Sequence, residues 1–194
     1  MRLRRAFAAQ AGVEAESRRG RGKGAELVGI EHLHRRARAA QQRDLDPARG
    51  QECLAQVQAA GAEGLFVATD VTQDDQVRSA VKQAVQKFGA LHVLMCSAGG
   101  SIPADDFIPD VDLAVFEHTM RLDLLGTIHA CRHAIPEIIK AGGGSVVTMS
   151  SGAALRGASP AHIYTAAKGG IISLTRALAG TYVKNNVRVN AIAA

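Results

Sequence analysis

The sequence predicts an α/β fold built on a doubly wound parallel sheet. Short apolar runs alternate along the chain with longer segments whose apolar residues recur at helical spacing, which is typical of strands alternating with helices. The 194 residues, 47% of them hydrophobic, suffice for one domain with a substantial core. Such an alternation predicts a parallel sheet with helices on both faces.

The first predicted elements follow one another from Pro47. Pro47 suits the first turn of a helix that runs to Ala60 and stops at Gly61. The apolar run Leu65–Ala68 predicts a buried strand. A second helix opens at Asp74 or Asp75 and ends before Gly89.

The remaining elements continue the same pattern towards the C-terminus. We expect Pro136 to kink or interrupt the longest helix, because proline removes a backbone donor from a helix interior. In order, the predicted elements are a strand over His92–Cys96, a helix over Asp112–Lys140, a strand over Val146–Met149, a helix containing Tyr164 and Tyr182, and a strand over Val187–Ile192.

Tyr164 and Lys168 are the candidate catalytic pair. Four residues apart on a helix, they share one face about one turn apart. A neighbouring ammonium favours the ionised form of a phenol, which can then exchange a proton with an alcohol or ketone near neutral pH. Ser151, at the end of a strand, could donate a hydrogen bond to the same oxygen. Taken alone, the pair is better explained by a surface helix that happens to carry a tyrosine and a lysine.

Further segments stand in a fixed order around this pair. They are Thr69-Asp70-Val71, Cys96-Ser97-Ala98-Gly99, Gly144–Ser151 with Tyr164 thirteen residues later, and Val187–Ile192. From about Asp44 to Ile192 the sequence closely resembles the short-chain dehydrogenase/reductase family. The resemblance implies a Rossmann-like domain that transfers hydride between NAD(P) and an alcohol or ketone.

The resemblance also implies a set of catalytic roles. Tyr164 would be the general acid/base, Lys168 would favour its ionised form and hold the ribose, and Ser151 would position the carbonyl oxygen. Asp123 stands where the family has an asparagine that supports a water-linked proton path to the lysine, largely through its backbone carbonyl. An acid there would favour a charged Lys168.

Cofactor contacts are implied at five further positions. Asp70 and Val71 would meet the adenine, and the small residues Ala98 and Gly99 would let the backbone approach the cofactor. Asp44 ends the family's second strand, where an acid accepts hydrogen bonds from ribose hydroxyls and repels a 2′-phosphate. This position favours NAD over NADP, although a helix cap at Asp44 or Asp46 explains the acids equally well.

Residues 1–43 do not share the resemblance. They hold eleven basic and four acidic side chains, a net charge of +7, against 12 basic and 14 acidic in residues 44–194, a net of −2. The glycine-rich stretch Arg18–Gly24 lacks the preceding apolar strand and the Thr-Gly-x-x-x-Gly-x-Gly pattern of a dinucleotide loop. Leu27–Ile30 is a candidate short strand without a following glycine turn.

We therefore divide the chain into an atypical basic segment, 1–43, disordered or out of frame, and a partial Rossmann-like domain, 44–194. A frame error, a wrong start site or a rearranged gene would explain the abrupt change at Asp44. The family continues beyond the position of Ala194 with a Pro-Gly segment, a substrate lid and a last strand. We thus expect a sheet that is incomplete at its first and last strands.

Several other classes of site are weakly indicated. His129 and His133 could share a metal, but no glutamate lies between them and no third ligand is indicated, so we expect a packed helix face and no metal. The odd set Cys53, Cys96 and Cys131 has no paired spacing, which favours a reducing, cytoplasmic location, with Cys96 a buried small hydrophobe.

The sequence thus predicts a short-chain dehydrogenase, truncated or corrupted, that acts on a small-molecule alcohol or ketone with NAD rather than NADP. No apolar run approaches the ~18 residues of a membrane span, and a basic arm without aromatic interleaving does not predict nucleic-acid binding. The family's long helices usually form its oligomer interface, which implies a homo-oligomer, a dimer or tetramer, if the fold is complete. The alternative is a catalytically silent relative that acts as an oligomerising interaction protein.

Overall fold

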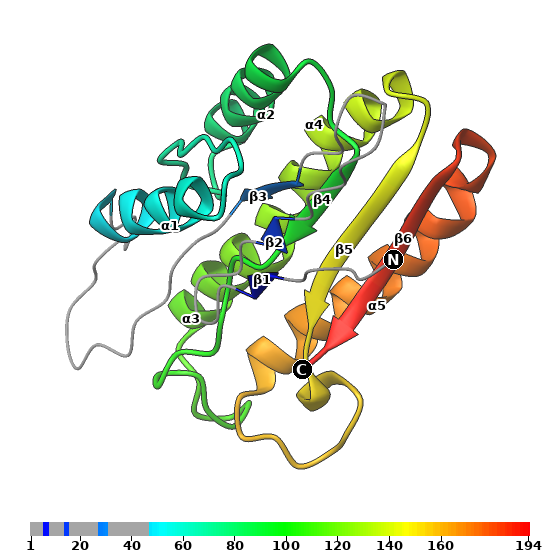
Figure 1. The fold of residues 1–194 in the computed structure, drawn as a ribbon. Coiled ribbons are helices and arrows are strands. Elements are labelled where there is room, and N and C mark those ends of the chain that lie inside the picture. The colour runs from blue at the N-terminus through cyan, green and yellow to red at the C-terminus, as the bar shows by residue number, and fades with distance from the viewer. Residues whose placement is uncertain (1–5, 8–13, 16–26, 31–46) are drawn as a thin grey trace.

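A computed structural model of the chain describes residues 6–7, 14–15, 27–30 and 47–194. Its main sheet has four parallel strands in the order β3-β4-β5-β6 (Figure 1). These strands are β3 Leu27–Ile30, β4 Val93–Cys96, β5 Gly144–Ser150 and β6 Val187–Ala193. Two short strands, β1 Ala6–Phe7 and β2 Glu14–Ala15, pair antiparallel with each other. The parallel sheet confirms the predicted α/β class.

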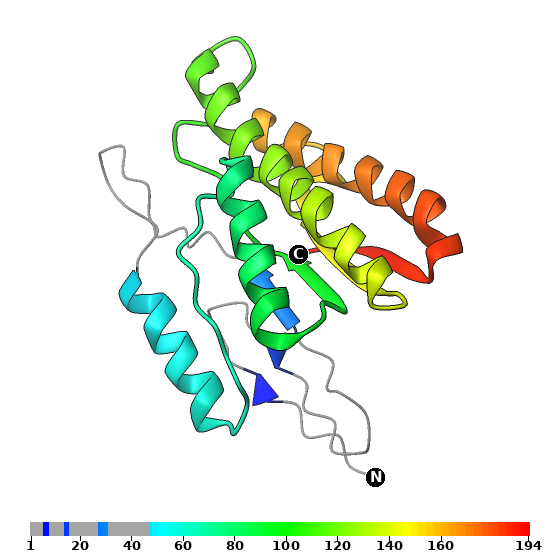
Figure 2. The same ribbon diagram turned by 90° about the horizontal axis from the view of Figure 1, so that it is seen from above.

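Five α-helices accompany the sheet among the described residues. They are α1 Pro47–Ala59, α2 Asp74–Phe88, α3 Leu113–Thr119, α4 Gly126–Lys140 and α5 His162–Tyr182. A π-helical segment, η1 Met120–Leu125, joins α3 to α4, and the 3-10 turns η2 Gly152–Ala154 and η3 Val183–Asn185 flank α5. Helices α2, α4 and α5 lie side by side across one face of the sheet (Figure 2).

The strand β3 lies next to β4, in register from Leu27 opposite Val93 to Ile30 opposite Cys96. In the doubly wound order the first strand of the fold lies beside the fourth, so β3 occupies the place of that first strand. The candidate strand at Leu27–Ile30 is therefore confirmed, and it pairs where the predicted sheet would otherwise be open.

Local sequence signals explain most element boundaries. The Asp112 carboxylate accepts a hydrogen bond from the Ala114 N–H, at 2.9 Å, and caps α3. Gly89 adopts a left-handed φ of 87° and donates its N–H to the Val85 carbonyl, which ends α2 as predicted. The buried side chains of the core are largely aliphatic, among them Leu94 and Val146 of the sheet.

Two predicted features of the secondary structure are wrong. Residues 64–70 form no strand, because Leu65–Ala68 finds no hydrogen-bonded neighbour among the described residues; Phe66 instead packs over Gly50 of α1. The predicted interruption at Pro136 is absent, since α4 continues to Lys140 with Ile135 and Ile138 buried around the proline; a kink at this position stays a prediction. The helix expected over Asp112–Lys140 is instead irregular at η1, a π-helical segment of a kind that often occurs at functional sites.

The predicted pair His129 and His133 joins α4 to the start of α2. His129 Nδ1 donates to the Val71 carbonyl at 2.9 Å, and His133 Nε2 donates to Asp74 Oδ1 at 2.9 Å. Arg132 adds a longer contact to the same carboxylate, at 3.8 Å. Within the described part of the chain, no group of three or more potential ligands is arranged to hold a metal ion, and no helix has the length and apolar character of a membrane span.

The Asp74 contacts predict a pH-dependent contribution to stability. The hydrogen bond from His133 is the largest cause that holds the pKa of the Asp74 carboxyl below its ordinary value of 3.8. A carboxyl with a lowered folded-state pKa stabilises the fold above its unfolded-state pKa, and this contribution is lost as the pH falls through the folded-state value. We expect Asp74→Asn to lower the urea midpoint at neutral pH, with a difference from wild type that shrinks below pH 3.8.

Urea unfolding at a series of pH values measures this effect. Asp75→Asn is the matched control, because Asp75 occupies the same first helical turn and is exposed. An equal loss in both variants, or a loss for Asp74→Asn that persists unchanged into strong acid, would contradict the role of the His133 contact.

Candidate active site

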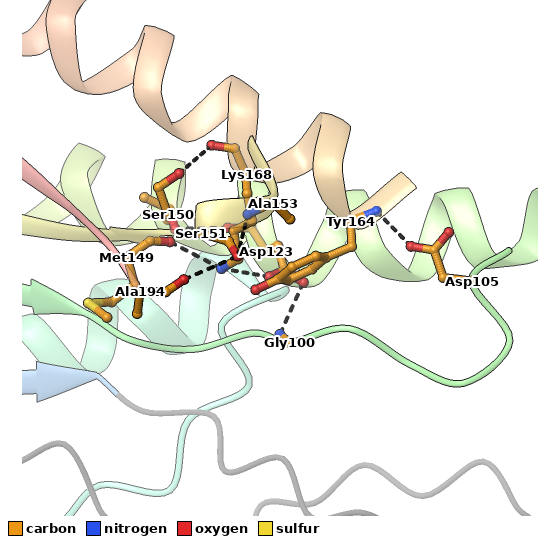
Figure 3. A network of polar contacts seen from close by, with 11 residues as sticks. Gly100, Asp105, Asp123, Met149, Ser150, Ser151, Ala153, Tyr164, Lys168 and Ala194 are labelled. Carbon is orange, nitrogen blue, oxygen red and sulfur yellow. Dashed lines mark hydrogen bonds and ion pairs between the residues drawn. The ribbon is translucent and has the colours of Figure 1, made fainter. Parts of the chain in front are cut away.

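The predicted catalytic residues gather at the carboxyl end of β5 (Figure 3). Ser151 directly follows this strand, and Tyr164 and Lys168 lie one turn apart in the first half of α5. Asp123 comes from the π-helical segment η1. Because carboxyl ends of parallel strands meet at one edge, the glycine-rich segment after β4 lies at the same place. Ligand sites of open α/β sheets form at this edge.

Lys168 is held in a buried ion pair. Its Nζ lies 2.8 Å from Asp123 Oδ1, and the two side chains are 4% and 0% exposed. The same ammonium donates to the Met149 carbonyl at 3.1 Å, at the end of β5. The Lys168 carbonyl in turn accepts from Ser150 Oγ at 2.8 Å, so the helix and the strand are tied together around the lysine.

Tyr164 lies above this lysine. Lys168 Nζ is 5.5 Å from the centroid of the Tyr164 ring, within the range of a cation–π contact. The ring extends towards Asp123, Lys168 and Ser151 in Figure 3, and Tyr164 as a whole is partly exposed. The four-residue spacing therefore places a partly accessible phenol beside a buried ammonium, as predicted.

Ser151 completes the cluster from the other side. Its side chain is buried; Oγ accepts from the Ala153 N–H at 3.2 Å and donates to the Ala194 carbonyl at 3.4 Å. The first contact caps the short turn η2, which fixes the Ser151 side chain at the strand end. A serine hydroxyl held in this way can donate to a substrate oxygen when its present acceptor is replaced.

Asp123 links the lysine to the segment after β4. The Gly100 N–H donates to Asp123 Oδ2 at 3.4 Å, while Oδ1 faces Lys168. Gly99 has a φ of 124°, and a Cβ there would lie 2.4 Å from Asp123 Oδ1. The backbone carbonyl of Asp123, implied in the proton path, accepts from Thr127 Oγ1 at 2.8 Å. Asp123 thus acts on both Lys168 and the glycine segment.

The structure describes four of the remaining implied cofactor residues, Asp70, Val71, Ala98 and Gly99. Asp70 Oδ1 accepts from Thr72, from its N–H at 2.9 Å and its hydroxyl at 2.8 Å. Val71 is 1% exposed and packs against Gly126, just after η1, and Ala98 is buried. Asp44, the residue that favours NAD, lies outside the described residues.

Two features of the site have no signal in the local sequence. The Asp105 carboxylate accepts from the backbone N–H groups of Ile163 and Tyr164, although it precedes them by 58 and 59 residues. The contact of Asp123 with Lys168 also joins two separate helical segments and has no local signal; the family resemblance is what implied that Asp123 lies near this lysine. Both contacts come from tertiary packing, and the contact of Asp105 is identified only by the three-dimensional arrangement.

Cys96 serves as a packing residue, as predicted. Its side chain is 4% exposed in the core, next to the equally buried Cys131 of α4. The hydrogen bond with the Cys131 thiol, together with burial, raises the pKa of Cys96 well above its ordinary value. A thiol kept protonated in this way is a poor nucleophile.

The known proteins that this chain resembles include dehydrogenases. The family of short chain dehydrogenases matches residues 30–194. Cis-4-hydroxycyclohexanecarboxylate dehydrogenase from Sinomonas cyclohexanicum is 37% identical over 134 residues, 69% of this chain and 53% of the relative. (+)-Borneol dehydrogenase 2 from Salvia officinalis is 34% identical over 66% of this chain and 45% of its own length. The chain spans about half the length of these curated relatives.

Solved structures share the fold. Carveol dehydrogenase from Mycobacterium avium, in complex with NAD, superposes with a TM-score of 0.73 at 26% identity, over 76% of this chain and 53% of that one. ElxO with NADP bound gives a TM-score of 0.64 at 29% identity, over 66% and 52%. With the family match over most of its length and Ser151, Tyr164 and Lys168 gathered at the sheet edge, the chain belongs to the short-chain dehydrogenase family.

Proposed function

We propose that the protein is an NAD(P)-dependent oxidoreductase that transfers hydride between the nicotinamide and an alcohol or ketone. The observation that carries this proposal is the position of Tyr164: a partly exposed phenol over the buried Lys168 ammonium, at the sheet edge that also holds Ser151. Family membership supports the same reaction class.

Each catalytic side chain has a defined task in this proposal. Ser151 Oγ donates to the reacting oxygen and holds it near Tyr164. The ionised Tyr164 oxygen takes the proton of the alcohol during oxidation, and the protonated Tyr164 hydroxyl gives a proton to the carbonyl oxygen during reduction. Lys168 holds its ammonium 5.5 Å from the centroid of the Tyr164 ring, beside the reacting phenol. The nicotinamide, when bound, supplies the hydride acceptor or donor.

The residues after β4 suit a bound dinucleotide. Ala98 and Gly99 keep the edge of the sheet free of bulky side chains, and the positive φ of Gly99 turns the backbone there. Lys168 is the residue that would meet the ribose, as the resemblance implies. The difference from the family pattern is Asp123, whose charge offsets that of Lys168; we propose that it positions the ammonium between Met149 and Tyr164.

We further propose which nicotinamide cofactor and which class of alcohol the protein uses. The argument for NAD over NADP rests on Asp44 and its proposed contact with the ribose hydroxyls; solved relatives hold NAD in one case and NADP in another. For the substrate we propose a cyclic secondary alcohol, because several relatives are named for ring alcohols. The exposed Phe107 and Ile108, near the start of α5, would suit an apolar ring.

Absorbance at 340 nm during alcohol oxidation tests the proposal. We expect the purified protein to reduce NAD in the presence of cyclohexanol-type alcohols, and to reduce NADP less efficiently. Equal turnover with both cofactors would contradict the choice of NAD, and turnover of straight-chain alcohols alone would contradict the substrate class. No turnover with any alcohol or ketone would favour the silent relative instead.

The proposal also covers the oligomeric state of the protein and its location in the cell. Leu113 and Phe116 of α3 and Ile128 of α4 are exposed apolar side chains on the long helical segment. We propose that they contribute to a homo-oligomer, a dimer or tetramer, since apolar surfaces of this kind favour association. The three cysteines, Cys53, Cys96 and Cys131, form no disulfide, which suits the reducing cytoplasm that we propose as the location.

A further inference from the structure

Asp105 is a buried carboxylate within an otherwise largely exposed loop. Residues 101–110 connect the glycine segment to α3, and Asp105 is 8% exposed while its neighbours Ala104 and Asp106 are exposed. Its N–H donates to the Ile102 carbonyl at 3.0 Å, which turns the loop inwards at this point. A buried carboxylate needs hydrogen-bond partners, so its contacts indicate its role.

Those partners are the first backbone groups of the active-site helix. Asp105 Oδ1 accepts from the Ile163 N–H at 3.1 Å. Oδ2 accepts from the Tyr164 N–H at 2.7 Å, the contact drawn in Figure 3. The first N–H groups of any helix lack partners within it, and the residue at the cap of α5, Ala161, has no side chain that could serve. The negative charge of a carboxylate also interacts favourably with the positive N-terminal end of the dipole of this 21-residue helix.

The same loop is attached to α5 at a second point. The Ile108 N–H donates to His162 Nδ1 at 3.0 Å. The ring of Phe107 stands edge-on to the ring of His162, with centroids 5.4 Å apart and an interplanar angle of 82°. The loop therefore contacts three consecutive residues at the start of the helix, the third of which is Tyr164.

We propose that Asp105 is a positioning residue that fixes the start of α5, and with it the Tyr164 phenol, relative to the loop of residues 101–110. The catalytic part of this inference rests on the proposed role of Tyr164 as general acid/base. Because Tyr164 itself donates its N–H to Asp105, loss of the carboxylate frees the backbone that carries the phenol. Displacements of about 1 Å in a reacting group can reduce rates on the order of 100-fold.

Steady-state kinetics of Asp105→Ala provide the catalytic test. We expect kcat to fall on the order of 10- to 100-fold, while KM for the cofactor is retained, since Asp105 contacts the backbone of Ile163 and Tyr164 and not Lys168. Asp105→Asn should recover part of kcat, because its amide oxygen still accepts one hydrogen bond. The control is Asp106→Ala, which removes an exposed carboxylate that accepts only from the neighbouring Phe107 N–H in the described loop, at 2.8 Å.

Hydrogen exchange measured by mass spectrometry tests the anchoring without any need for turnover. We expect peptides that contain Ile163 and Tyr164 to exchange faster in Asp105→Ala than in wild type, with Asp105→Asn between them and Asp106→Ala unchanged. Wild-type protection in both Asp105 variants, or an equal effect of Asp106→Ala, would overturn the inference. A wild-type protein without turnover would refute the proposed reaction instead, and exchange would still decide the anchoring. Should Asp105→Ala fail to fold, Asp105→Asn compared with Asp106→Ala decides both measurements.

Discussion

Tyr164→Phe is expected to lower kcat for alcohol oxidation by about 10²- to 10⁴-fold, the usual contribution of general acid/base catalysis. The substitution removes a single oxygen atom, the one that is proposed to exchange a proton with the substrate. The ring over Lys168 remains, so the cation–π contact at 5.5 Å and the packing of α5 are kept. Initial rates at saturating cofactor measure the effect.

The matched control for this variant lies on the same helix. Tyr182 is at the end of α5, 18 residues beyond Tyr164, where it packs against the hydrophobic core. Tyr182→Phe should leave kcat unchanged, because that hydroxyl lies at the other end of the helix. Wild-type turnover by Tyr164→Phe would refute the assignment of this residue as general acid/base.

Among the variants proposed here, Lys168→Met is expected to cause the largest decrease in the free energy of unfolding. The variant leaves the carboxylate of Asp123, 0% exposed, without its ammonium partner. Removing one member of a buried ion pair typically lowers the free energy of unfolding by about 3–5 kcal/mol. The second change Asp123→Asn replaces that charge by an amide of the same shape, so we expect the double variant to recover part of the loss.

Urea unfolding of the two single variants and the double variant gives the coupling free energy of the pair. The exposed pair Lys140 and Glu137, with its Nζ–Oε1 distance of 2.6 Å, is the comparison. Water screens such a pair, and its coupling should stay below about 1 kcal/mol. Additive losses for Asp123 and Lys168, or a coupling no larger than that of the exposed pair, would contradict the structural importance of the buried contact.

Elements with strong local signals could be predicted from the sequence. Proline at Pro47 and glycine at Gly89 mark helix ends by their backbone properties, and the structure places helix boundaries at both. Helical spacing alone put Tyr164 and Lys168 on one face. These predictions succeeded because the residues that determine them are close together in the chain.

Features that depend on distant segments could not be predicted in the same way. Leu65–Ala68 has the composition of a strand, but a strand also requires a neighbour, and none pairs with it among the described residues. Pro136 stays inside α4, where the buried residues around it keep the helix intact. The contact of Asp105 with α5 spans 58 residues, so no local pattern could indicate it.

The most direct test of the account is a fluorescence titration of NADH into the purified 194-residue chain. We predict saturable binding that Lys168→Met weakens, measured at a temperature where the variant is folded, and that Tyr182→Phe leaves unchanged. A chain that unfolds cooperatively in urea and yet shows no saturable binding would contradict the central claim, that the edge of the sheet around Gly99 and Lys168 is a nicotinamide cofactor site.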